Sequence, residues 1–153
     1  MVACYPAPNS GEAPFGAHPK RDWPDPHAGE DALFVSPLSP GCESRFVFDF
    51  EGVVAPHPGD AAATETIRRL ILDDRSAGGI LTPNRRSAIT ATLNNRALPL
   101  ADARKRLRVL EQQEASGGRL DEFCFALKQA LLRHIRQVEA RVQGIRATRM
   151  KTQ

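Results

Sequence analysis

The only residues whose pattern is typical of catalysis are Asp49 and Glu51, which stand within RFVFDFEGVV at positions 45–54. Phenylalanine occupies every second position from 46 to 50, and both acids lie at positions between or directly after these aromatics. The alternation predicts a β-strand over 45–54 with one aromatic face and one mostly polar face. The two carboxylates would lie on the same face of this strand, and Gly52 would permit a bend after them.

The segment Asp49-Phe50-Glu51-Gly52-Val53-Val54 resembles the first motif of haloacid-dehalogenase-type phosphatases, a strand that ends in D-x-D-G-[TV]-[LV]. The resemblance implies that Asp49 is the nucleophile and that Glu51 replaces the aspartate that serves as general acid/base. The segment is equally similar to the D-x-E motif of DEDD-type 3′–5′ exonucleases, which implies that both carboxylates bind metal. Each resemblance covers about ten residues, and both families need further strands, which the sequence after Val54 does not predict. A divergent phosphatase or nuclease that uses Asp49 and Glu51 is therefore our third hypothesis. The simpler alternative is a phenylalanine-rich strand that pairs within the chain or adds to a partner's sheet.

Contact with nucleic-acid phosphates is a second kind of chemistry that the sequence suggests. The candidate residues form two groups, Arg85 and Arg86, then Arg104, Lys105, Arg106 and Arg108. A short helix, a tight turn and a basic helix would fit a helix-turn-helix-like protein. Acidic residues interrupt the basic face, however, and no aromatic residue lies among these charges. Solvated charged faces and contact with an acidic protein surface are the two other interpretations of the same residues.

Metal and cofactor sites are not predicted. Six His, Asp and Glu residues occur between His18 and Asp31, but their spacing matches no metal motif and the prolines among them favour an irregular backbone. We therefore expect a solvated loop there, with no metal and no cofactor. The three cysteines form no CxxC pair and their number is odd, which indicates reduced thiols in an intracellular protein.

The longest predicted element is an amphipathic helix over residues 119–149, directly after a Gly-Gly breaker. Its apolar residues recur at alternating four- and three-residue steps, which is typical of a packed or supercoiled helix. Such a helix would span about 46 Å, more than the core of a chain of 153 residues can cover. We therefore predict that part of this row packs within the chain and part binds another chain or a second copy. The candidate partner-binding residues are Leu120, Leu127, Leu131, Ile135, Val138 and Val142.

The remaining segments predict a mainly α fold. Ten of the 12 prolines fall within the first 58 residues, so we expect a Pro-rich extended or disordered segment over 1–44. Apolar periodicity and Gly, Pro and Asn breakers predict three shorter helices, over 61–74, 83–95 and 99–115. Together with the short strand and the long helix, these would form one mainly helical domain over 45–153.

The charge distribution is uneven along the chain. Residues 1–60 carry three basic and nine acidic residues, a net charge of −6, whereas residues 61–153 carry 18 basic and nine acidic residues, a net charge of +9. No apolar run is long enough to span a membrane, and the N-terminus lacks a basic region followed by an apolar core, so no secretory signal is predicted. Our first hypothesis is a non-enzymatic adaptor or subunit of a larger assembly that binds other protein chains through the long helix. Nucleic-acid binding is the second.

Overall fold

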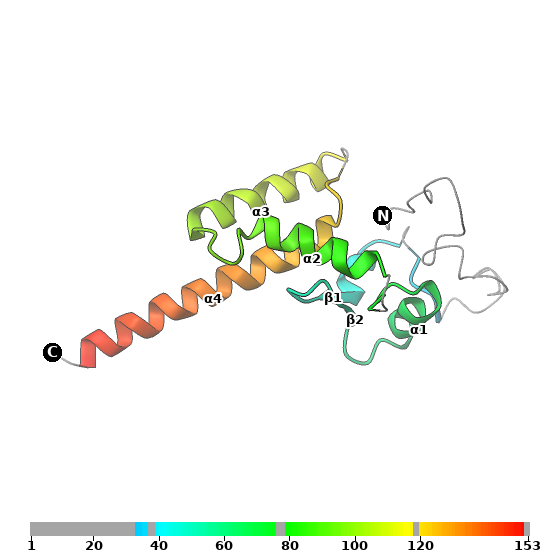
Figure 1. The fold of residues 1–153 in the computed structure, drawn as a ribbon, viewed down its shortest axis with the longest axis horizontal. Coiled ribbons are helices and arrows are strands. Elements are labelled where there is room, and N and C mark those ends of the chain that lie inside the picture. Colours follow the sequence, from blue (N-terminus) through cyan, green and yellow to red (C-terminus); the bar gives the residue numbers. More distant parts are fainter. Residues whose placement is uncertain (1–32, 37–38, 76–78, 118–119, 152–153) are drawn as a thin grey trace. The chain divides into compact units, whose positions relative to one another are not determined.

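The computed structural model describes residues 33–36, 39–75, 79–117 and 120–151, with side chains described as far as residue 145. Over these residues the fold is mainly helical, as predicted, with four α-helices and one two-stranded sheet (Figure 1). The elements in chain order are β1 Phe46–Phe48, β2 Val54–Pro56, α1 Ala61–Leu70, α2 Leu81–Thr92, α3 Leu100–Ala115 and α4 Cys124–Lys151. Most of the predicted Pro-rich segment, including all of residues 1–32, lies outside the described residues.

The chain divides into two compact units, of which the first ends at Ser87 and the second begins at Ala88. The first unit holds the sheet, α1 and the start of α2, and the second holds the end of α2, α3 and α4. The division lies inside the region 45–153 that the sequence suggested as one domain. Each unit has its own buried apolar residues, so each is built around a core.

In the first unit, the segment predicted as a single strand over 45–54 is instead the start of a β-hairpin. The strands β1 and β2 pair antiparallel, with the Cα partners Phe46–Pro56, Val47–Ala55 and Phe48–Val54. The reversal is made by Asp49, whose Oδ1 accepts the backbone N–H groups of Glu51 and Val53, each at 2.9 Å. Gly52 adopts φ 77° in this turn, a left-handed conformation that glycine tolerates without strain.

Helix α1 ends at Leu70, four residues before the predicted end. Ile71 adopts φ 50°, and the N–H of Leu72 donates to the carbonyl of Ile67 at 3.0 Å, which closes the helix. The turn places Leu72 in an apolar cluster with residues of β2 and α2, where it is buried. Burial of this leucine offsets the cost of a left-handed conformation at the preceding β-branched residue.

Asp60 fixes the start of α1 through two interactions. Its Oδ1 accepts the N–H of Ala63 at 2.8 Å, which caps the helix. Its two oxygens also accept hydrogen bonds from the Arg45 guanidinium, each at 2.6 Å. Hydrogen bonding to Arg45 lowers the pKa of Asp60 below its ordinary value of 3.8.

We expect Asp60→Ala to lower the free energy of unfolding by about 1 kcal/mol in urea denaturation at neutral pH, because the helix cap is lost. The matched variant Asp60→Asn keeps a capping oxygen and removes only the charge. The Arg45 side chain is 39% exposed, so we expect this variant to cost less than about 1 kcal/mol.

The difference in free energy of unfolding between wild type and Asp60→Asn should be constant above the ordinary carboxyl pKa. It should decline as the pH falls through the lowered pKa of folded Asp60, because protonation removes the charge that Arg45 binds. A difference that grew toward low pH would contradict this account.

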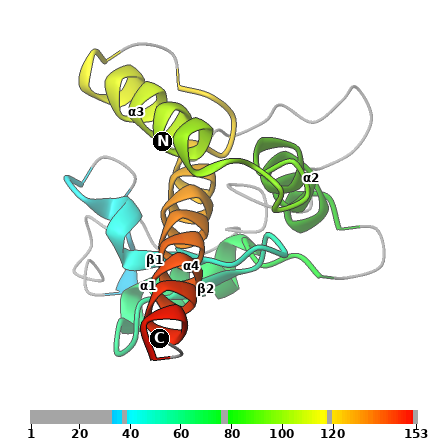
Figure 2. The ribbon, with the colours of Figure 1, turned by 90° about the vertical axis from the view of Figure 1, so that its left-hand side faces the viewer.

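In the second unit, α3 and α4 run antiparallel and pack against each other (Figure 1). Arg104 of α3 pairs with Glu139 of α4 at 2.5 Å, and Glu114 of α3 pairs with Lys128 of α4. The buried apolar residues of the two helices are Ala103, Leu107, Leu110, Cys124, Ala126, Leu127, Ala130, Leu131 and Ile135. Figure 2 looks along α4 and shows it as one uninterrupted helix.

Backbone conformation moves two helix ends of the second unit away from their predicted positions. Helix α2 stops at Thr92, three residues before the predicted end, because residues 94–96 all have positive φ. Helix α4 begins at Cys124 rather than at 119, because Phe123 has φ 58° and cannot belong to a right-handed helix. Helix α3 agrees with its predicted bounds to within one residue.

Candidate functional site

The residues predicted to bind a partner fall into two groups along α4. Leu127, Leu131 and Ile135 are 4%, 0% and 9% exposed, so the first half of the apolar row belongs to the core of the second unit. Leu120, which precedes α4, and Val138 are half-buried. These side chains stabilise the fold, and most of their surface is not available to another molecule.

The second group lies further along the same row. Val142 is 40% exposed, and Ile145, three residues later, is 67% exposed. Ile145 was not among the predicted partner-binding residues, although the alternating four- and three-residue steps lead directly to it. The sequence therefore contained the signal for this residue, but not the fact that the row is uncovered there.

The exposed part of α4 lies beyond the first residue of α3, Leu100. Arg104 lies opposite Glu139, and α3 begins only four residues before Arg104, at Leu100. In an antiparallel pair this places Leu100 about one helical turn beyond Glu139, close to Val142. Residues 141–145 are all exposed, and α4 continues to Lys151, about 12 Å past the first residue of α3. We refer to residues 141–151 as the distal segment of α4 (Figure 1).

The charges of the distal segment all have the same sign. Its basic residues are Arg141, Arg146, Arg149 and Lys151. Arg141 is exposed and is paired with no acid among the residues that the structure describes. Glu139 is the last acidic residue of the sequence, and its carboxylate already binds Arg104. The distal segment thus combines two exposed apolar side chains, Val142 and Ile145, with a sequence whose charged residues are all basic.

Arg85, predicted as a nucleic-acid contact, is buried in the first unit at 5% exposure. Its Nε donates to the carbonyl of Gly52 at 2.8 Å, and its Nη2 donates to the carbonyl of Leu72 at 2.6 Å and to the Thr82 hydroxyl at 3.1 Å. Burial lowers the pKa of Arg85 to about 10, and nearby aspartate carboxylates oppose this shift, so the side chain is charged at neutral pH. A guanidinium held in this way cannot reach a phosphate, and its placement counts against a nucleic-acid role.

The other predicted nucleic-acid contacts are exposed, and three of them form ion pairs. The pairs are Arg86–Glu51 at 3.1 Å, Arg104–Glu139 at 2.5 Å and Arg106–Asp121 at 3.4 Å. Lys105 and Arg108 have no acidic partner within the described ranges. Successive residues of an α-helix point about 100° apart, so the basic residues at 104, 105 and 106 do not form one stripe along α3.

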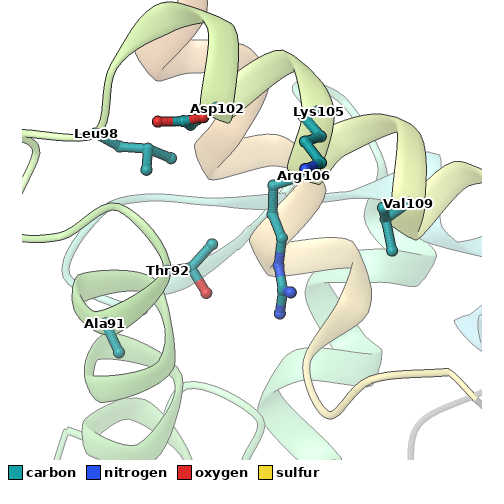
Figure 3. Close-up of a pocket in the computed structure, with 7 residues that line it drawn as sticks. All are labelled: Ala91, Thr92, Leu98, Asp102, Lys105, Arg106 and Val109. Carbon is teal, nitrogen blue, oxygen red and sulfur yellow. The ribbon is translucent and has the colours of Figure 1, made fainter.

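An open cavity of about 500 Å³ lies between the end of α2 and α3 (Figure 3). It is lined by Ala91, Thr92, Leu98, Asp102, Lys105, Arg106 and Val109. Two basic side chains beside apolar walls could receive an anionic group, but Asp102 adds an opposing carboxylate and Arg106 also lies near Asp121. Lys105 is therefore the only cation of this lining without an opposing group of its own, which is weak support for a ligand site.

The hairpin gives Asp49 and Glu51 structural partners. Asp49 accepts two backbone N–H groups of the turn, and Glu51 pairs with Arg86. Both enzyme families that the motif resembles need further strands, whereas the sheet of the described residues consists of β1 and β2. No group of three or more His, Cys, Asp or Glu side chains within the described residues could hold a metal ion. The phosphatase or nuclease hypothesis therefore gains no support from this geometry.

No protein-family model, curated protein or solved structure matches the chain. Among the described residues, no helix is both long enough and apolar enough to cross a membrane. The feature that points most directly to a function is the distal segment of α4, because its apolar row continues that of the core and none of the described residues covers it fully.

Proposed function

We propose that the chain is a non-enzymatic interaction module, an adaptor or subunit of a larger assembly, that binds another protein chain through the distal segment of α4. The observation that supports this proposal is the exposure of Val142 and Ile145, which lie on α4 beyond the first residue of α3. Both residues follow the row that packs inside the second unit at Leu131 and Ile135. A helix placed against them would continue an interface whose first half is already formed.

The size of the expected contribution agrees with a binding role. Val142 is 40% exposed and Ile145 is 67% exposed, so covering both removes from water about as much apolar surface as one fully exposed side chain. Full burial of one such side chain contributes about 1.5–3 kcal/mol, a useful part of a binding free energy. A single exposed apolar residue is common on protein surfaces, but two on one helical row that leads out of a core are more specific. The free thiols Cys42 and Cys124 support an intracellular location for this module.

Nucleic-acid binding is a second proposal, now limited to α3. Lys105 and Arg108 are exposed and have no acidic partner among the described residues, so they remain suitable for phosphate contacts. Each phosphate contact would make the affinity depend on salt concentration. This proposal does not account for the exposed apolar side chains of the distal segment, and we therefore rank it below protein binding.

Site-specific photo-crosslinking tests the first proposal. A photoreactive amino acid is placed at position 145 and, as a matched control, at position 143, which is also exposed but lies on the opposite side of α4. We expect a discrete protein adduct from position 145 and not from position 143, in the cells from which the chain comes. The adduct partner is then identified, purified and titrated with the full chain. Ile145→Glu should weaken this reconstituted complex at least about tenfold, since a charge would replace an apolar contact. Equal crosslinking from both positions, or an affinity that Ile145→Glu leaves unchanged, would rule the proposal out.

A further inference from the structure

We infer that the partner of the distal segment is an acidic amphipathic helix, which lies along α4 in line with α3. This inference rests on the proposed function and adds the chemistry of the partner. It starts from the shape of the uncovered surface, a straight helix with apolar residues on one side. Between Glu139 and Lys151 the helix offers about 18 Å of length, enough for three turns of a second helix.

The interface between α3 and α4 indicates which charges such a helix must carry. Two ion pairs join charged residues of α4 to opposite charges on α3, Lys128 to Glu114 and Glu139 to Arg104. Beyond Glu139 the sequence of α4 contains four basic residues and no acid. A helix that continues the same kind of packing must therefore place carboxylates opposite Arg141 and the basic residues that follow it.

The same charges distinguish this partner from the other possible occupants. A second copy of α4 would bring the same four basic residues to the contact, and their repulsion would oppose a self-associated pair. A nucleic acid would neutralise the charges but would leave Val142 and Ile145 in water, because phosphates offer no apolar surface. An acidic amphipathic helix is the occupant that satisfies both the charge and the apolar row.

Binding of designed peptides to the full chain tests the inference. The probe is a fluorescent peptide of three heptads with leucine at positions a and d and glutamate at e and g, whose like charges keep it from pairing with itself. Two matched peptides carry glutamine or lysine at e and g. We expect the glutamate peptide to bind at least about tenfold more tightly than the glutamine peptide, and the lysine peptide to bind more weakly than either. The affinity of the glutamate peptide should fall as the salt concentration is raised from about 0.05 M to about 0.5 M.

Two variants of the chain locate the contact. Ile145→Glu should weaken binding of the glutamate peptide at least about tenfold, whereas Gln143→Glu, an identical change in charge on the opposite side of α4, should weaken it less than about threefold. Circular dichroism of both variants checks that α4 is still helical.

Equal binding of all three peptides, with Ile145→Glu reducing each, would overturn the acidic chemistry and leave the proposed protein contact standing. Absence of binding by every peptide, or equal effects of the two variants, would overturn the inference. Tighter binding of a DNA duplex than of the glutamate peptide, unchanged by Ile145→Glu, would also overturn the inference. The crosslinking experiment then decides separately whether a protein contacts position 145.

Discussion

Leu131→Ala should lower the free energy of unfolding by about 2–5 kcal/mol, because it leaves a cavity in the core of the second unit. Leu131 is 0% exposed and belongs to the buried row of α4, the helix that packs against α3. Ion pairs between the two helices, at Lys128 and Glu139, lie on either side of it along α4. A close-packed core relaxes only partly around a missing side chain, so most of the cavity should remain. The loss should appear in urea denaturation followed by circular dichroism, because most of the described structure is helical.

The adjacent residue is the control for this prediction. Leu132→Ala removes the same atoms from the same helix, but Leu132 is 37% exposed, and we expect a loss of less than about 1 kcal/mol. Similar losses at the two positions would mean that the buried face of α4 is not the one described. The comparison also affects binding experiments, because a variant at Leu127, Leu131 or Ile135 would lose affinity by unfolding. Val142 and Ile145 are the exposed residues of the described part of this row, so they can report on a partner without this complication.

The sequence was sufficient to predict α4 and its apolar row, because the spacing of the leucines, isoleucines and valines is a local property of the chain. It did not reveal which part of the row is covered. That depends on where α3 begins relative to α4, and the contacts that align the two helices join residues far apart in the sequence, such as Arg104 and Glu139, 35 residues away. The six predicted partner-binding residues therefore mixed core leucines with a surface valine and omitted Ile145.

Three local predictions differed from the structure for a related reason. Ile71 and Phe123 adopt positive φ although neither residue type favours it, so no local pattern at these positions marks a helix end. The alternation of phenylalanines correctly indicated extended chain at β1, but it did not show that Asp49 would accept two turn amides and reverse the direction. At Ile71 the burial of Leu72 and at Asp49 a side chain bonded to the backbone decided the outcome, and not residue propensity.

Arg85 and Arg86 are adjacent and identical in type, and the sequence analysis placed them in one basic group. Their exposure could not be predicted from the sequence either. The start of α2 turns Arg85 toward the first unit and leaves Arg86 at its surface. Arg85 donates to the carbonyls of Gly52 and Leu72 and so joins the hairpin turn to the segment after α1. Its guanidinium also lies 5.5 Å from the centre of the Phe48 ring, a distance at which a cation and a ring attract each other.

Arg85→Met should therefore destabilise the first unit strongly, by about 3–5 kcal/mol, because it leaves two backbone carbonyls without their donor in a buried place. Methionine keeps much of the length and flexibility of the side chain, so the loss would reflect the hydrogen bonds more than the volume. Arg86→Met is the matched control. Its ion pair with Glu51 joins side chains that are 64% and 54% exposed, and we expect a change of no more than about 1 kcal/mol.

Urea denaturation of both variants, together with titration of a DNA duplex, separates a structural from a binding role. A structural Arg85 predicts lost stability in Arg85→Met alone. Unchanged stability with a lower affinity for the duplex in Arg85→Met would instead return this residue to the nucleic-acid hypothesis, because a guanidinium that contacts phosphate must lie at the surface.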